Sequence, residues 1–190
     1  MNVTFKQVAH DHIRECFLTV LKEYPALHPY PITLEQKTLK GSTMQAQPII
    51  RLSNLFSSQK RYRVRLAHFV RDSPDLPIHE LDPAVLTGWF AHEMGHLVDF
   101  EGRSNLGMVG YGLRYLVSTK HQRQAEHEAD YIALKAGFYD EIMATKEFLL
   151  NHVLIDDGYK AKLHKYYMSP QDVDVWMSSH APHVQTALEL

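Results

Sequence analysis

The sequence is poor in the features that mark secreted, membrane-spanning or nucleic-acid-binding proteins. Its 190 residues include one cysteine, Cys16, so no disulfide can form within the chain and a reducing compartment is favoured. No apolar run reaches the roughly 18 to 20 residues that a membrane-spanning helix needs. The formal charge of −2 gives no net attraction for nucleic acid or anionic membranes. We therefore expect a cytoplasmic protein with no membrane span and no nucleic-acid partner; the oligomeric state is left open.

What the sequence does contain is enough apolar material to bury one core. Hydrophobic residues make up 45% of the chain, and a length of this order is typical of one globular domain. We expect a single domain over 1–190, with a helix and a sheet in 4–81, two long helices in 82–137, and further helices and a tail in 138–190. This order indicates an α+β fold with a small mixed or antiparallel sheet of about three to four strands.

The N-terminal part is expected to hold one helix and then the strands. Residues 4–24 have apolar positions at helical spacing, and Pro25 ends the pattern. Strands are expected at 32–40, 42–52 and 61–70. In the third of these, Arg61, Arg63 and Arg65 alternate with apolar residues, which is typical of a half-exposed strand and suits the edge of a sheet.

The rest of the chain is expected to be mainly helical. The segment 105–117 holds three glycines and is expected to be a loop with room for a short helix. Apolar spacing and capping residues predict helices at 82–102, 120–135, 140–153, 157–167 and 170–178.

The first of these helices carries the motif HEMGH, which runs from His92 to His96. Residues four apart share one face of a helix, so the two imidazoles can converge on one metal ion. Imidazole is a good zinc ligand, and a catalytic zinc site uses three protein ligands and leaves a position for water. Glu93 can reach that water and act as general base and then acid. The alternative is two ordinary polar histidines beside an unrelated glutamate.

The third metal ligand is expected from the helix at 120–135. The stretch AEHEADYIALKAGF puts Glu126 and Asp130 one turn apart. One carboxylate can bind the metal while the other orients a ligating histidine through its ring N–H. Small residues along the same helix, and Gly95 on the first, allow close approach of the two helices. The alternative is an ordinary solvated acidic face. Zinc is the expected cofactor, with a His, His, Glu ligand set.

Together, HEMGH and EHEADYIALKAGFYD resemble the HtpX and CAAX-prenyl-protease type of gluzincin metallopeptidase. The resemblance covers about 85–140 and implies a zincin-like fold, in which a sheet packs on an active-site helix and a glutamate-bearing helix. It implies zinc ligands at His92, His96 and Glu126, the general base at Glu93, and a ligand-orienting aspartate at Asp130. The family is mostly membrane-embedded, whereas this chain looks like a soluble, minimal relative.

A fainter similarity concerns the end of the chain. SSHAPHVQTALEL resembles the family's late T-H-P-x-x-x-x-R-I segment and implies that His180 is a catalytic residue near the metal. Ala181 and Thr186 stand where the family has proline and arginine. His180 is the first candidate for the donor that stabilises a tetrahedral oxyanion. The other candidates are Tyr139, His152, His164, Tyr166 and Tyr167.

These residues predict a zinc-dependent endopeptidase that acts on a peptide or protein substrate. The substrate would lie extended along the strand at 61–70, where the three arginines would favour acidic peptides. Two alternatives stay open. The chain also resembles the ImmA/IrrE type of HExxH protein, a cytoplasmic peptidase that acts on one regulator. The other alternative is a structural or latent metal-binding protein, with the cleft filled by its own C-terminal tail.

Overall fold

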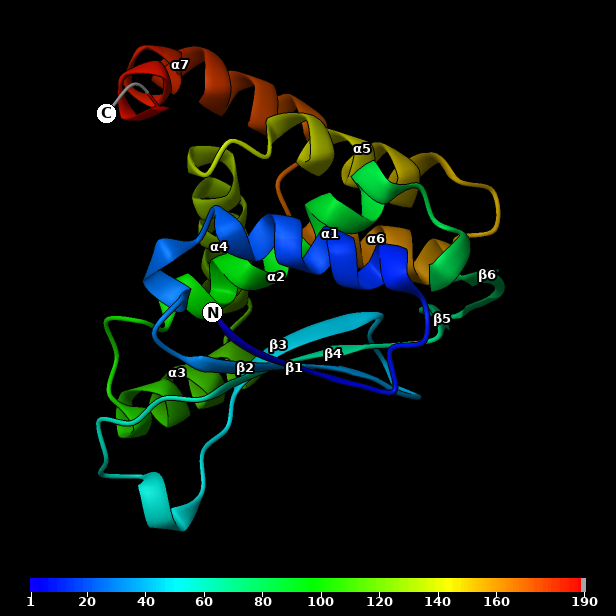
Figure 1. The fold of residues 1–190 in the computed structure, drawn as a ribbon. Coiled ribbons are helices and arrows are strands. Elements are labelled where there is room, and N and C mark those ends of the chain that lie inside the picture. Colours follow the sequence, from blue (N-terminus) through cyan, green and yellow to red (C-terminus); the bar gives the residue numbers. More distant parts are fainter. Residues whose placement is uncertain (189–190) are drawn as a thin grey trace.

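The computed structural model describes residues 1–188, with side chains through His180. It confirms a mixed α+β fold in which one face of a small sheet is covered by helices (Figure 1). The main sheet contains, in spatial order, β1 (Asn2–Lys6), β2 (Pro31–Gln36), β4 (Tyr62–Leu66) and β3 (Met44–Pro48). A second sheet pairs β5 (Phe69–Val70) with β6 (Ser73–Pro77). The α-helices are α1 (Asp11–Lys22), α2 (Pro83–Asp99), α3 (Asn105–Val117), α4 (Thr119–Lys135), α5 (Tyr139–Asn151), α6 (Asp157–Tyr166) and α7 (Pro170–Leu188).

The N-terminal segment is a strand followed by a helix, so the single helix expected over 4–24 is wrong. Residues 2–6 alternate between exposed and half-buried and pair in parallel with β2, Val3 opposite Ile32 and Phe5 opposite Leu34. Gln7 has a positive φ of 56°, a conformation that ends the strand. The apolar positions before Asp11 fit the spacing of a helix and also the alternation of a strand. The pairing with β2 decides in favour of the strand. Cys16 is buried on α1.

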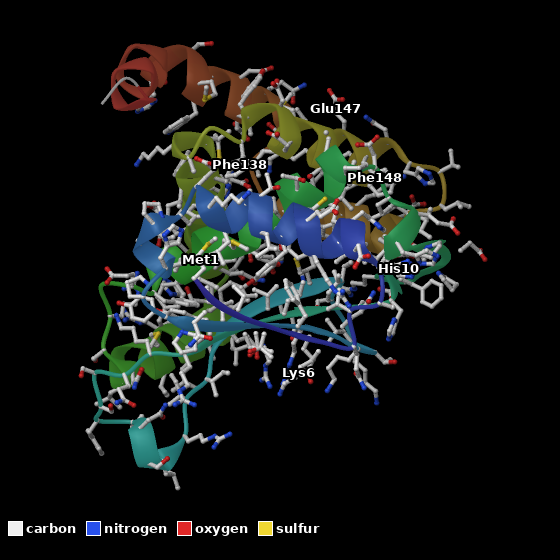
Figure 2. All side chains as sticks on the ribbon, viewed as in Figure 1. Met1, Lys6, His10, Phe138, Glu147 and Phe148 are labelled. Carbon is white, nitrogen blue, oxygen red and sulfur yellow. The ribbon has the colours of Figure 1, made fainter. Side chains whose placement is uncertain are left out.

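The arginine-rich strand β4 lies inside the sheet, so the expectation that 61–70 forms an edge is wrong. β4 pairs in parallel with β2 on one side and antiparallel with β3 on the other. Its alternation is confirmed, because Tyr62, Val64 and Leu66 are buried while Arg63 and Arg65 face Glu35 of β2 at 3.9 and 3.8 Å. The arginines therefore lie on the sheet face that the helices leave open, toward which Lys6 also points (Figure 2). The edges are β1 and β3.

The segment 105–117 is a regular helix rather than a loop. Ser104 caps α3 by accepting a hydrogen bond from the backbone N–H of Gly107 at 3.1 Å. None of its three glycines has a positive φ. The weak helix propensity of these glycines is offset by the packing of Met108 and Tyr111 into the core. Glycine content indicated a loop here, and tertiary contacts overrode it.

α2 is the central helix, as expected of a helix that is apolar on most sides. Asp82 caps it by accepting a hydrogen bond from the Ala84 N–H at 2.8 Å, and Pro83 occupies its first turn. It packs against α1, α4 and α5. No described helix combines the length and the hydropathy needed to cross a bilayer.

The crossing of α2 and α4 depends on Gly95. A Cβ atom at this position would lie 2.5 Å from the carbonyl oxygen and 3.0 Å from the Cα of Ala129. Both are backbone atoms, so Gly95→Ala must push the helices apart, and we expect a loss of about 3 kcal/mol in the free energy of unfolding. Gly110→Ala on α3 is the matched control, since a Cβ atom at that position would meet no other atom within 4 Å, and it should gain up to about 1 kcal/mol. Urea unfolding of both variants measures the difference; equal effects would contradict the packing argument.

Candidate metal centre

α2 and α4 bring three potential metal ligands together. His92 and His96 lie one turn apart on α2, with ring centroids 4.8 Å apart and ring planes nearly perpendicular. Glu126 projects from α4, and its Oε2 atom lies 3.0 Å from His92 Nε2 and 3.3 Å from His96 Nε2. The three ligand atoms all lie within 4.8 Å of one another. This is the set that the sequence predicted, and it could hold a metal ion.

The chemistry of the cluster fits a cation. Burial tends to raise the pKa of Glu126, but His96 and His92 hold it well below the usual carboxylate range. Burial tends to lower the pKa of His92, and its contacts with Asp130 and Glu126 instead raise it to about 10. His92 therefore carries a positive charge between two carboxylates. A divalent metal ion would displace the proton on Nε2 and place its own positive charge among the same ligand atoms.

Asp130 orients His92, as the sequence predicted. Its Oδ1 atom lies 2.9 Å from His92 Nδ1, so the Nδ1–H donates to Asp130 and leaves Nε2 pointing at Glu126. Its Oδ2 atom accepts a hydrogen bond from Lys146 Nζ of α5 at 2.7 Å. Burial tends to raise the pKa of Asp130, but Lys146 and His92 lower it to about 2. The carboxylate therefore stays charged and keeps its two partners.

The sequence reasoning missed Lys146. α5 buries Ile142, Thr145, Lys146 and Leu149, which share one face of the helix. A lysine within that apolar face was the available signal, because a buried ammonium needs a carboxylate partner. Tyr115 was also missed: its hydroxyl donates a hydrogen bond to Glu126 Oε1. It lies on α3, which the glycines had indicated to be a loop.

Asp130→Asn is expected to weaken metal binding without abolishing it. The amide cannot supply the charge that fixes the His92 tautomer and pairs with Lys146, and loss of such a partner typically costs 10- to 100-fold in metal affinity. Glu128→Gln on the same helix is the control, since Glu128 is exposed and forms no ion pair with any residue whose side chain is described. Competition against a zinc-responsive dye gives both affinities; equal affinities would remove Asp130 from the site.

Glu93 lies beside the cluster and is anchored to the sheet. It is buried, and one carboxylate oxygen accepts a hydrogen bond from the backbone N–H of Ala46 in β3 at 2.6 Å. Burial raises its pKa, His96 and His92 act in the opposite direction, and the net shift is upward. Glu93 is outside the three-residue ligand set. Within the motif, His92 and His96 therefore belong to the cluster that could hold a metal ion, and Glu93 lies outside it.

β3 presents a free edge next to Glu93. Odd-numbered residues of this segment bond toward β4, as in the hydrogen bond from Ile49 N–H to Arg61 O at 2.8 Å. The Ala46 N–H points the other way, toward Glu93. The edge nearest the cluster is therefore β3, and not the strand at 61–70 that the sequence favoured.

A cavity of about 100 Å³ opens beside His92 and Glu93, between α2, α5 and α6. Tyr167 borders it, with its ring centroid 5.4 Å from that of His92. Burial raises the pKa of Tyr167 well above its usual value, so its hydroxyl stays protonated and can donate. The apolar part of the wall includes Trp89, Ile142, Leu149, Leu163 and Met168.

The structure does not bring His180 to the cluster. Its ring stacks on Trp176 at 4.4 Å on an exposed side of α7, and Nδ1 contacts the Trp176 carbonyl at 2.9 Å. α7 continues as a helix to Leu188 (Figure 1). The catalytic role implied for His180 therefore finds no support in these contacts and stays a prediction. Ala181 and Thr186 lie outside the residues whose side chains are described.

Of the other candidate donors, Tyr167 and His164 border the cavity. Tyr139 donates to Asp174 at 2.6 Å, and His152 lies against Phe148. Tyr166 is half-buried on α6. Asp99, one turn after His96, forms an ion pair with Arg103 at 2.7 Å instead of contacting a ligand.

Comparison of the chain with protein-family models, with curated proteins and with solved structures found no match. The fold and the site show a mixed α+β protein with a buried His, His, Glu cluster that could hold a metal ion.

Proposed function

We propose that the protein is a zinc-dependent endopeptidase of the gluzincin type. The observation that carries the proposal is the convergence of His92, His96 and Glu126 within 4.8 Å, next to a buried glutamate that is not itself a ligand. Two imidazoles and one carboxylate form the ligand set of several zinc peptidases. The HEMGH and EHEAD motifs, which resemble that class, contribute these same residues.

His92, His96 and Glu126 would hold the zinc, and Asp130 with Lys146 would keep His92 oriented. When bound, zinc polarises a carbonyl and lowers the pKa of a coordinated water to near 7. Glu93 accepts the proton of the attacking water on its carboxylate and later delivers it to the leaving nitrogen. Its raised pKa suits this role, since the proton must be held and then released.

The substrate would add to the sheet as a strand beside β3, because β3 has the free edge nearest the cluster. The cavity beside His92, whose wall is apolar along α5 and α6, has room for an aliphatic side chain of the substrate. Tyr167 replaces His180 as the first candidate for the oxyanion donor, since it borders the same cavity and keeps its proton.

Hydrolysis of an unfolded protein tests the proposal. Zinc-loaded protein should release peptides from casein, and a chelator such as 1,10-phenanthroline should stop the reaction. Cleavage of one partner protein without casein digestion would favour the regulatory ImmA/IrrE-like alternative. Activity that first appears after removal of the residues beyond Met177 would favour the latent alternative.

A further inference from the structure

The solvent side of α3 carries large apolar side chains that do not contribute to the core. α3 packs inward through Met108 and Tyr111, which are buried. Its opposite side is also apolar, and Leu116 and Val117 are 79% and 82% exposed. Surface helices of globular proteins normally turn polar residues to solvent on that side. The exposed stripe on α3 consists of Leu106, Val109, Leu113, Leu116 and Val117.

A loop extends this apolar stripe. Residues 49–61 connect β3 to β4, and their tip exposes Leu52 by 93% and Phe56 by 86%. The side-chain amide of Asn105, at the start of α3, donates to the carbonyl oxygens of Asn54 at 2.6 Å and Ser57 at 2.9 Å. The loop and α3 therefore lie at one end of the molecule, away from α5 and α7 (Figure 1). We call the five residues of the stripe, with Leu52 and Phe56, the α3–loop surface.

The two chain segments that contain the α3–loop surface carry charge of one sign. The segments 36–71 and 102–125 contain no aspartate or glutamate, yet they hold eight and four of the 20 lysines and arginines. Six exposed cations in these segments form no ion pair with any residue whose side chain is described. Four of the six belong to the loop or to α3, or follow α3 directly: Arg51, Arg61, Arg114 and Lys120. The net charge of −2 conceals this excess of cations, because the carboxylates lie in other parts of the sequence. Two of those carboxylates, Asp99 and Glu35, pair with Arg103 and with Arg63 and Arg65, and the four cations named above stay unpaired.

We propose that the α3–loop surface docks on an anionic lipid bilayer. The apolar side chains would enter the boundary between headgroups and acyl chains, and the four cations would lie at the level of the lipid phosphates. The charge pattern favours a bilayer over a second copy of the chain, because an isologous dimer through this surface would bring like charges together. The exposed leucines, valines and phenylalanine favour lipid over nucleic acid, whose phosphates need only the cations.

Docking in this way would place the metal cluster close to the bilayer. The inward side of α3 carries Tyr115, whose hydroxyl donates to Glu126. Only the thickness of one helix, about 10 Å, would then separate the lipid from the cluster. The inference does not depend on the proposed peptidase activity, since the surface would bind lipid whether or not the cluster holds zinc.

Vesicle co-sedimentation of the full-length protein tests the inference. We expect binding to vesicles of phosphatidylcholine with one quarter phosphatidylglycerol, at least tenfold weaker binding to phosphatidylcholine alone, and weaker binding in high salt. Leu113→Asp with Leu116→Asp should lower the partition coefficient at least tenfold. Val153→Asp with Val175→Asp is the matched control, because it adds the same charge at exposed apolar positions outside the surface, and it should change binding less than twofold. Circular dichroism verifies that both double variants are folded.

Four results would overturn the inference. The first is no binding to anionic vesicles, and the second is equal loss in the two double variants, which would reflect charge alone. The third is a wild-type dimer in light scattering that Leu113→Asp with Leu116→Asp converts to a monomer, without vesicle binding by either. The fourth is binding to a short oligonucleotide that the same pair leaves unchanged, again without vesicle binding.

Discussion

His96→Ala and Glu126→Ala are each expected to remove the zinc that the wild type should carry at about one ion per chain. Each change deletes one of the three atoms that converge within 4.8 Å. The cost should exceed the 10- to 100-fold that follows from losing a hydrogen-bond partner of a ligand. Elemental analysis after dialysis against a competing chelator measures the bound zinc, and near-zero content is expected for both variants.

His127→Ala and Glu128→Ala are the matched controls for the zinc measurement. Both residues lie on α4 beside Glu126, and both are outside the ligand set. They should keep the zinc of the wild type. A wild type that takes up no zinc after reconstitution, or a Glu126→Ala variant that binds it as tightly, would exclude the two-helix site.

Glu93→Gln is expected to abolish peptide hydrolysis while zinc stays bound. The amide can still accept the hydrogen bond from the Ala46 N–H, so the contact between α2 and β3 survives. It cannot take up a proton from water, and loss of a general base typically costs 10²- to 10⁴-fold in rate. The measurements are kcat on a peptide substrate and zinc content of the same sample.

Glu101→Gln is the control for that rate. Glu101 follows α2 and accepts a hydrogen bond from the Tyr30 hydroxyl at 3.0 Å, outside the metal cluster. The Glu101→Gln variant should hydrolyse the peptide substrate at the wild-type rate. If Glu93→Gln keeps both its zinc and its activity, the carboxylate is not the general base. If it loses zinc as well, Glu93 has a structural role at the site, and the division of HEMGH into ligands and base is wrong.

Metal analysis and vesicle binding together separate the two proposals. If the protein binds anionic vesicles and carries no zinc, the docking inference stands and the peptidase proposal is excluded. Zinc-dependent hydrolysis without vesicle binding would do the reverse. Because the α3–loop surface and the ligand set share no residue, the variants that test one leave the other unchanged.

The sequence by itself determined the parts of the site that obey local geometry. An α-helix places residues i and i+4 on one face, so His92 and His96 had to converge once α2 formed. The same spacing put Glu126 and Asp130 one turn apart on α4. Asp82, Pro83 and Ser118 marked the start of these helices through capping chemistry that needs only neighbouring residues.

Only the tertiary structure decided which distant segments meet. Strand pairing with β2 made residues 2–6 a strand, and the sheet order made β3 the free edge instead of β4. The partners Lys146 and Tyr115 come from α5 and α3, and the path of α7 holds His180 at the exposed surface. The single domain expected over 1–190 stays a prediction. Local spacing acts within a few residues, whereas these contacts depend on how whole elements pack, which no short window of sequence contains.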